Sequence, residues 1–250
     1  MERDLTSGSV FRNVIYFSLP YFLSYFLQTL YGMADLFIVG QFDGVASTTA
    51  VSIGSQVMHM LTVMIVGLAM GATVSIGQSI GAGDKKRASV FVGNTVTLFM
   101  GISLVLAVLL LFFVKPIVSV MSTPAEAVSG TAAYLTICFL GIPFITAYNV
   151  ISSIFRGLGD SKSPMYFIAV ACAVNIILDY LFIGFFHLGA SGAALGTTLS
   201  QAFSVLFALT AIKRRQTGLS LSGDCFLPQK KTLGKILNIG MKNKNENLHS

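Results

Sequence analysis

The sequence predicts an all-α polytopic membrane protein in which six transmembrane helices form one bundle. Hydrophobic residues make up 54% of the 250 residues and charged residues only 10%, and the mean hydropathy is +0.78. This composition excludes an ordinary soluble globular protein. A transmembrane helix needs about 20 mostly apolar residues, and the chain contains six stretches of that length. It shows no HExxH, GxSxG or similar hydrolytic motif, so it is not expected to be an enzyme.

The expected spans follow one another with short polar connections. They are Val14–Val39, Ala50–Ile76, Val90–Val114, Ala132–Phe155, Met165–Phe186 and Ser191–Ile212. The first is longer than the apolar core of a signal peptide, about 7 to 15 residues, so it is expected to remain as a span. The predicted organisation is a cytoplasmic N-terminus (residues 1–13), the six-helix bundle (14–212), and a basic cytoplasmic linker followed by the aborted start of a seventh helix (213–250).

Several residues within these stretches predict local features of the helices. Pro20 and Pro143 lie inside the first and fourth spans, where proline removes a backbone hydrogen bond and kinks a helix, and Pro20 is the candidate hinge. Small residues cluster in the second and sixth spans, which favours close helix packing. His59, near the middle of the second span, is interpreted as a hydrogen-bonded core residue rather than a proton relay.

Two connections share the pattern GxGDxK, at residues 81–86 and 157–162. Glycine can end a helix in the left-handed conformation, and aspartate can cap the next helix with its side-chain oxygen. Neither segment has the GxxxxGK[ST] pattern of a phosphate-binding loop. Both are therefore predicted to be tight turns between helices.

Basic residues indicate how the chain is oriented, because Lys and Arg accumulate in cytoplasmic loops. With the N-terminus inside, the outer loops carry only Lys115, whereas the inner segments carry Arg3, Arg12, Lys85, Lys86, Arg87, Arg156, Lys162, Lys213, Arg214 and Arg215. Both termini are expected in the cytoplasm of a cell that keeps this protein in its inner (plasma) membrane. The net charge of +6 is then explained by topology, and no nucleic-acid partner is expected.

Asp35 and Asp179 each lie inside an apolar span, where an unpaired carboxylate costs at least roughly 2.5 to 3.5 kcal/mol. Each therefore needs a proton, a cation or a partner. Asp35 lies roughly 7 Å from the outer end of its helix and Asp179 roughly 10 Å from the outer end of its own, at a rise of 1.5 Å per residue. The alternative is that each carboxylate bonds locally near the interface.

Other polar groups are expected at the same depth. Asn175 lies four residues before Asp179 and shares its helical face. Thr197 lies roughly 9 Å from the outer surface, and Ala193, one turn earlier, offers a backbone carbonyl. Such an oxygen-rich cluster is what a proton or a hard cation such as Na⁺ requires. Gln28, Tyr134 and Asn149 either line a polar cavity or hold helices together.

Four segments together resemble the multidrug and toxic compound extrusion (MATE) family of cation-coupled antiporters. They are LPYFLSYFLQTLYGMADLFIVGQFDGVASTTAVSIGSQ, GQSIGAGDKKRAS, IFRGLGDSKSPM and NIILDYLFI with LGASGAALGTTLSQ. The resemblance covers about residues 8–239 and implies the N-terminal bundle, or N-lobe, of a twelve-helix transporter. It also implies a cation site at Asp35, Asn175, Asp179 and Thr197 with the backbone near Ala193, and weaker cavity positions at Gln28, Tyr134 and Asn149.

The resemblance implies export of small organic, often cationic, compounds against H⁺ or Na⁺, with no cofactor. The lipid bilayer and a missing C-terminal bundle or a second copy of the chain are the other expected partners. After LGKILNIGM the sequence becomes polar, and the expectation is a chain truncated to its N-terminal half. Two alternatives remain: a flippase for lipid-linked precursors of the same superfamily, and a membrane fragment or interaction module without transport activity.

Overall fold

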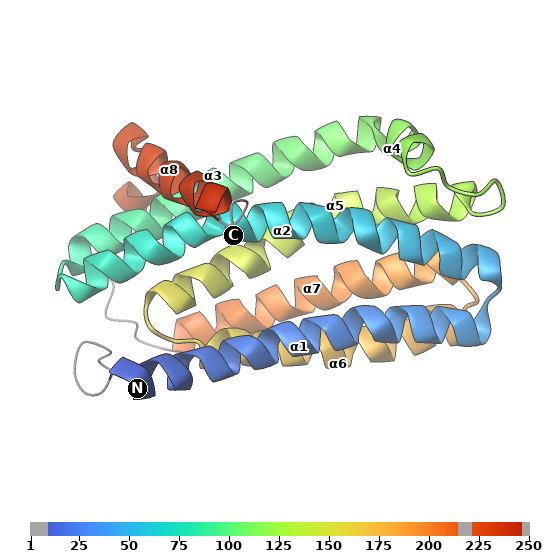
Figure 1. Cartoon of the computed structure of the whole chain (residues 1–250), viewed down its shortest axis with the longest axis horizontal. Helices are drawn as coiled ribbons and strands as arrows, with labels where there is room; N and C mark the ends of the chain where they lie inside the picture. Colours follow the sequence, from blue (N-terminus) through green and yellow to red (C-terminus); the bar gives the residue numbers. More distant parts are fainter. Residues whose placement is uncertain (1–9, 215–221, 247–250) are drawn as a thin grey trace.

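The computed structural model describes residues 10–214 and 222–246, and within these residues it is helical and contains no strand (Figure 1). The elements in chain order are α1 (Val10–Phe42), α2 (Val45–Gly81), α3 (Lys85–Phe112), α4 (Val114–Val120), α5 (Val128–Gly157), α6 (Lys162–Asp179), the π-helix η1 (Tyr180–Phe185), α7 (Gly189–Arg214), the 3-10 helix η2 (Gly223–Phe226) and α8 (Lys230–Glu246).

Six of the described helices are long and apolar enough to cross a membrane. They are α1, α2, α3, α5, α6 continued by η1, and α7, and each contains nearly all of one predicted stretch. The fold class is therefore confirmed. The division of the chain at residues 13 and 212 remains a prediction.

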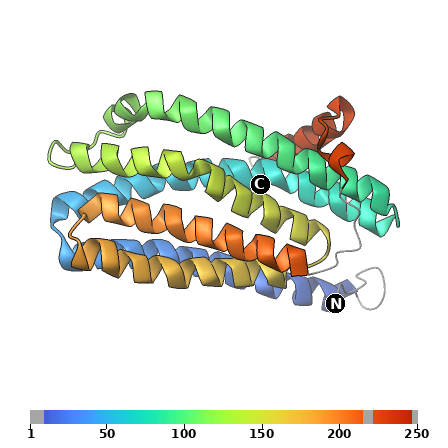
Figure 2. The same ribbon diagram turned by 180° about the vertical axis from the view of Figure 1, so that it is seen from behind.

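Helix α5 lies at the centre of the bundle. Of its most apolar window, 67% is buried, against 17% for α1. It packs against α2, α3 and α7, while α6 lies between α7 and α1. The helices thus form two layers, with α2, α3 and α5 in one and α1, α6 and α7 in the other (Figure 2). Helix α1 lies at the edge and leaves most of its apolar surface uncovered.

Most of the basic residues lie at one end of the bundle. The start of α1, the α2–α3 and α5–α6 turns and the end of α7 all lie at this end, whereas α4 lies at the other (Figure 1). We call the end with the two turns the basic end. It includes Lys85, Lys86, Arg87, Arg156, Lys162 and Lys213, while Lys115 is on α4.

The two GxGDxK segments form the predicted turns at the basic end. Gly83 and Gly159 have φ angles of +74° and +86°, in the left-handed region. The Asp84 carboxylate accepts a hydrogen bond from the backbone N–H of Arg87 at 2.9 Å. The Asp160 carboxylate accepts one from the backbone N–H of Ser163 at 3.0 Å. The turns are thus held by their own glycine and aspartate, as the sequence predicts.

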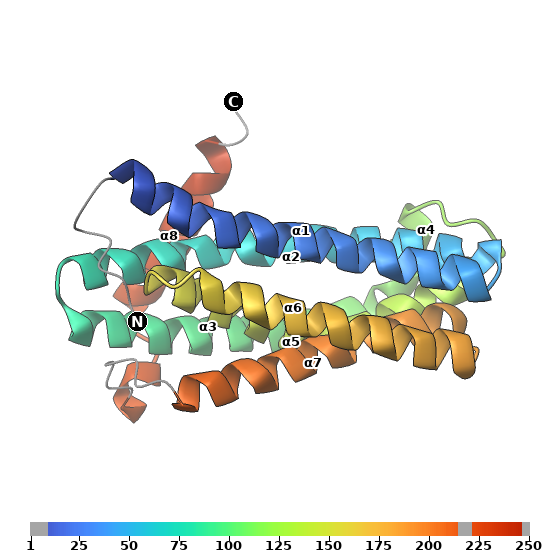
Figure 3. The ribbon, with the colours of Figure 1, turned by 90° about the horizontal axis from the view of Figure 1, so that it is seen from below.

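The segment after α7 contains a longer helix than the sequence indicates. The 17-residue α8 crosses α2 and α3 at a steep angle and is not among the six candidate spans (Figure 3). Its Ile236 is fully buried. A side chain on Gly71 of α2 would overlap the Ile236 carbonyl, so the absence of a Cβ at Gly71 allows the two helices to touch.

Polar side chains of α3 hold the residues that lead into α8. The Asn94 amide donates to the Cys225 carbonyl at 3.0 Å, and its oxygen accepts from the Gln229 N–H at 2.7 Å. The Thr97 hydroxyl donates to the Phe226 carbonyl at 2.8 Å. Backbone groups of η2 and the start of α8 therefore find partners on α3.

The structure adds detail to two of the predicted spans and contradicts one local prediction. The third span ends at Phe112, and after a break at Phe113 a separate helix α4 follows. The fifth span changes from an α-helix to a π-helix after Asp179. The prediction that His59 is a core residue was wrong: it is exposed on the surface of α2, because the buried face of the helix at this level is formed by the two residues before it, Val57 and Met58.

Candidate functional site

The structure brings Asp35, Asn175, Asp179 and Thr197 together inside the bundle. Asp35 is on α1, Asn175 and Asp179 on α6, and Thr197 on α7. Asp35 is 3% exposed, Thr197 is 9% exposed, and the other two are fully buried. The Thr197 hydroxyl donates a hydrogen bond to Oδ2 of Asp35 at 3.2 Å. The two carboxyl groups are close enough to interact, and the Asn175 amide lies beside both.

Most polar atoms of this cluster lack hydrogen-bond partners among the described residues. These atoms are Oδ1 of Asp35, both carboxyl oxygens of Asp179, and the side-chain oxygen and nitrogen of Asn175. A buried polar group without a partner typically costs about 1–3 kcal/mol, and more when it is charged. Because the unpartnered atoms converge from two helices, one proton or one cation placed between them would satisfy several at once.

Local helix geometry positions the two residues of α6. Asn175 and Asp179 are four residues apart, so their side chains lie on the same face of the helix. Asp179 is the last α-helical residue before the π-helix η1. Single π-type turns inside helices frequently occur at functional sites, because they displace a side chain relative to a regular α-helix.

Gly196 lets α7 approach the cluster. A Cβ atom on this residue would overlap Oδ1 of Asp179 and would lie 3.4 Å from the Asn175 amide nitrogen. The α7 backbone therefore forms one wall of the site. The sequence analysis did not single out Gly196. Its position directly before Thr197, in a run of small residues, could have indicated a close approach of the helix backbone.

Two further residues border the cluster. Tyr31, one helical turn before Asp35 on α1, has a buried hydroxyl with no hydrogen-bond partner among the described residues, and it was not singled out in the sequence. Ala193 is fully buried on the same face of α7 as Thr197. Its carbonyl lies within a regular helix, where one lone pair remains after the backbone hydrogen bond. Its role as a ligand stays a prediction.

The three weaker cavity candidates are spread over the bundle. Gln28 is half-buried on α1. Tyr134 is 2% exposed and packs in the core of α5, against Gly54 of α2. The Asn149 amide donates to the Ile145 carbonyl at 2.8 Å, within α5. Only the Tyr134 contact joins two helices, whereas the Asn149 bond stays within α5, and the cavity role stays a prediction for all three.

The donor set at the cluster is made of oxygen atoms. Carboxylate, amide and hydroxyl oxygens suit protons and hard cations, whereas nitrogen and sulfur ligands suit transition metals. Among the described residues, no group of three or more His, Cys, Asp or Glu side chains is placed to hold a metal ion. Oxygen donors of this kind are those that a proton or a hard cation such as Na⁺ uses, and the binding role of the cluster stays a prediction.

Comparisons with known proteins agree with this architecture. The family model MatE matches residues 20–181. The chain is 32% identical over 206 residues to the probable multidrug resistance protein YpnP of Bacillus subtilis (strain 168), covering 82% of this chain and 46% of YpnP. It is 28% identical over 234 residues to the multidrug export protein MepA of Staphylococcus haemolyticus (strain JCSC1435), covering 94% of this chain and 52% of MepA.

A solved structure shares the fold. A crystal structure of MATE in the bent conformation superposes with a TM-score of 0.87 at 28% identity, covering 94% of this chain and 52% of that chain. The chain thus spans about half the length of the relatives it matches, and the match is to their N-terminal half. Taken together, the six-span bundle, its buried carboxylates and these matches show that the chain belongs to the MatE family of membrane transporters.

Proposed function

We propose that this chain forms the cation-coupling half of a multidrug exporter. The observation that carries the proposal is the cluster of Asp35, Asn175 and Asp179, whose buried polar atoms, apart from Oδ2 of Asp35, lack hydrogen-bond partners among the described residues. Support comes from the multidrug transport proteins YpnP and MepA, which the chain resembles over most of its length. The expected substrates are small organic, often cationic, compounds, and the expected coupling ion is H⁺ or Na⁺.

The mechanism follows from what the cluster can bind. When a proton or Na⁺ occupies the cluster, α1, α6 and α7 are drawn together by shared oxygen ligands. When the cluster is empty, two neighbouring carboxylates repel each other in a medium of low dielectric constant. Binding therefore favours a compact arrangement of these helices, and a ligand shifts a conformational equilibrium by its difference in affinity for the two states.

Helix α1 is the element most free to respond. It is the least buried of the six spans, and Pro20 interrupts its hydrogen-bond ladder in the half opposite to Asp35. The Ser24 hydroxyl donates to the Pro20 carbonyl at 2.8 Å, a bond that often accompanies helix bending. We propose that α1 bends at Pro20 when the cluster changes its occupancy.

The proposal includes a second bundle, either the C-terminal half found in the longer relatives or a second copy of this chain. Alternating access in transporters is largely a rocking of one bundle against another around a central site. The protein would lie in the cell's plasma membrane with the basic end in the cytoplasm, since Lys and Arg favour that side.

The test replaces Asp179 with Asn in the protein expressed together with its second bundle. Ethidium efflux is measured from cells that lack their other exporters. We expect D179N to abolish efflux driven by a proton or sodium gradient, because the neutral amide cannot release a proton or neutralise Na⁺. The matched control is Asp224→Asn, which makes the same change at an exposed position on η2.

A second measurement uses the purified chain. Infrared difference spectra between alkaline buffer and buffer at about pH 6, where exposed carboxylates with a pKa of about 4 remain ionised, should show the carbonyl stretch of a protonated carboxylic acid, and this band should weaken in D179N but not in D224N. Equal ethidium efflux in D179N and the unmodified protein would overturn the proposed coupling role.

A further inference from the structure

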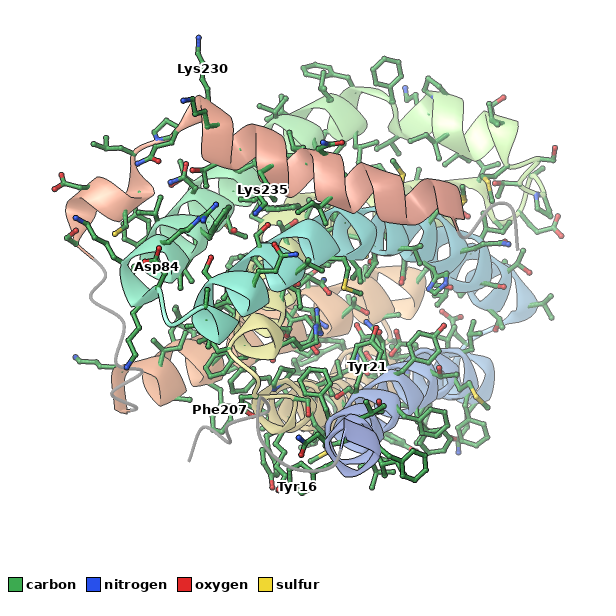
Figure 4. The ribbon with its side chains drawn as sticks, turned by 60° about the vertical axis from the view of Figure 1, so that its left-hand side comes forward. Tyr16, Tyr21, Asp84, Phe207, Lys230 and Lys235 are labelled. Atoms are coloured by element: carbon green, nitrogen blue, oxygen red, sulfur yellow. The ribbon has the colours of Figure 1, made fainter. Side chains whose placement is uncertain are left out.

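A cleft of about 380 Å³ lies between the first turns of α3 and the beginning of α8. Its lining is strongly basic, with Lys86 and Arg87 from α3 and Lys231 and Lys235 from α8. Asp84 is the only acidic side chain among the described residues that line it. One oxygen of that carboxylate already caps α3 by accepting the Arg87 N–H. Figure 4 shows Asp84 at the start of α3 and Lys235 on the neighbouring α8.

The aromatic ring of Phe91 makes cation–π contacts with two of the basic side chains. The guanidinium carbon of Arg87 lies 5.9 Å from the ring centroid, and the Lys235 ammonium nitrogen lies 5.6 Å from it. Lys235 also donates to the Gln78 side chain at 3.4 Å. Phe91 itself is 3% exposed. The two like charges are therefore held near one ring, and an anion between them would relieve their repulsion.

The depth of the cleft matches the lipid headgroups. At a rise of about 1.5 Å per residue, Lys86 lies about 19 Å and Phe91 about 11 Å from the middle of α3. The hydrocarbon core extends about 15 Å from the bilayer centre, and the headgroup region reaches about 20 to 22 Å. With α3 close to upright and centred in the bilayer, the basic side chains lie at the level of lipid phosphates and the buried ring lies at the depth of the hydrocarbon.

Exposed apolar side chains, outside the lining of the cleft, lie nearer to the bilayer centre. Phe226, whose carbonyl accepts from Thr97, and the next residue, Leu227, are 38% and 61% exposed. Phe226 lies beside Thr97, two turns further along α3 than Val90. A phosphate held at the basic mouth would therefore have apolar surface beneath it for acyl chains.

We propose that this cleft binds the phosphate group of an anionic phospholipid, such as phosphatidylglycerol, and thereby fastens α8 to α3. Basic pockets beside the cytoplasmic ends of transmembrane helices are a recurrent site for anionic headgroups. A free phosphate ion offers the same kind of charge, but the depth of the cleft and the exposed side chains of Phe226 and Leu227 nearer to the bilayer centre favour a lipid. The proposal does not depend on transport activity.

The test measures lipid binding to the purified full chain in detergent by native mass spectrometry, with phosphatidylglycerol, phosphatidylcholine and soluble glycerol phosphate as the three probes. The cleft variant combines Lys86→Gln and Lys231→Gln, two exposed side chains. The control variant combines Lys115→Gln and Lys213→Gln, which are also exposed but lie outside the cleft.

We expect phosphatidylglycerol to bind the unmodified chain more tightly than phosphatidylcholine. In the cleft variant its affinity should fall about twenty-fivefold, from about fivefold for each of the two basic residues removed. The control variant should bind as the unmodified chain does. Should the double variant fail to fold, as judged by circular dichroism, Lys231→Gln alone on the exposed start of α8 gives the same test with about a fivefold loss.

Three results would overturn the proposal. Equal binding of the two lipids, or equal losses in the cleft and control variants, would show that the cleft does not recognise anionic lipid. Displacement of phosphatidylglycerol by glycerol phosphate at a similar concentration would retain the phosphate site but reject a lipid as its occupant.

Discussion

At the scale of single residues, the buried cluster depends on a position that has no side chain. Gly196 brings the α7 backbone against Asp179 and Asn175. A larger residue there would push α7 away from α6 and change the space between the carboxylates. The cluster is therefore shaped by backbone contact as well as by its polar side chains.

The variant Gly196→Ala tests this dependence. We expect it to destabilise the chain by about 1–3 kcal/mol, as typically follows when a methyl group is forced into a packed interior. The measurement is thermal unfolding of the purified protein in detergent. The control is Gly67→Ala on α2, where a Cβ would meet nothing within 4 Å. If G196A unfolded at the same temperature as G67A, the close approach of α7 to Asp179 would be contradicted.

The grouping of the polar side chains was predictable, but the finer geometry was not. The depths of Asp35, Asp179 and Thr197 follow from sequence spacing, because each residue of a helix adds about 1.5 Å along its axis. Spacing within one helix does not tell how closely two helices approach. For this reason the sequence pointed to the depth of the cluster but not to Gly196 or the buried hydroxyl of Tyr31.

At the scale of secondary structure elements, α8 is fastened to the bundle by polar contacts and by close packing. Asn94 uses both its donor and its acceptor on backbone groups on either side of Leu227. The face of α8 that carries Ile236 then packs on α2 at Gly71. The hydrogen bonds of Asn94 and the close contact at Gly71 together hold α8 across α2 and α3.

The variant Asn94→Leu should loosen this attachment. It keeps the approximate size of the side chain but removes the two hydrogen bonds to the segment before α8, each worth about 1 kcal/mol. Cys225, now 7% exposed, should then react with a water-soluble maleimide at least about tenfold faster, since loss of about 1.4 kcal/mol corresponds to a factor of ten. The control Gln56→Leu alters an exposed amide on α2. Unchanged labelling of Cys225 in N94L would argue against the proposed attachment of α8 through Asn94.

The elements that the sequence did not predict have physical explanations. The break at Phe113 separates α3 from α4 within a continuous apolar run, so hydropathy alone does not mark it. The change to a π-helix after Asp179 leaves composition unaltered. Helix α8 mixes lysine, asparagine and apolar residues, and this pattern gives a helix that lies on other helices rather than one that spans.

At the scale of the whole molecule, the separation of charge between the two ends predicts an orientation. Lys115 lies at the end of the bundle opposite to the Lys85–Arg87 segment. If the basic end faces the cytoplasm, the turn after α4 must face the outside. This prediction is independent of the transport proposal and can be tested in intact cells.

The experiment places single cysteines at the two ends, in a background where the three native cysteines are replaced by serine. Ser122→Cys lies after α4, and Ala82→Cys lies in the α2–α3 turn, both at exposed positions. A membrane-impermeant maleimide should label S122C in intact cells and A82C only after the cells are opened. The reverse pattern would show that the basic end faces outward.

The central position of α5 has a consequence for how the protein is made. The helices enter the membrane in the order of the chain, and the main packing partner of α2 and α3 is α5. These two spans therefore lie in the bilayer without their main packing partner while α4 and the connection before α5 are synthesised. The carboxylate of Asp35 lacks its neighbours for longer, because Asp179 and Thr197 are synthesised only with α6 and α7. A ribosome stalled before α5 would thus hold a nascent chain whose early helices lack most of their native neighbours, and membrane chaperones and proteases would act on it at that stage.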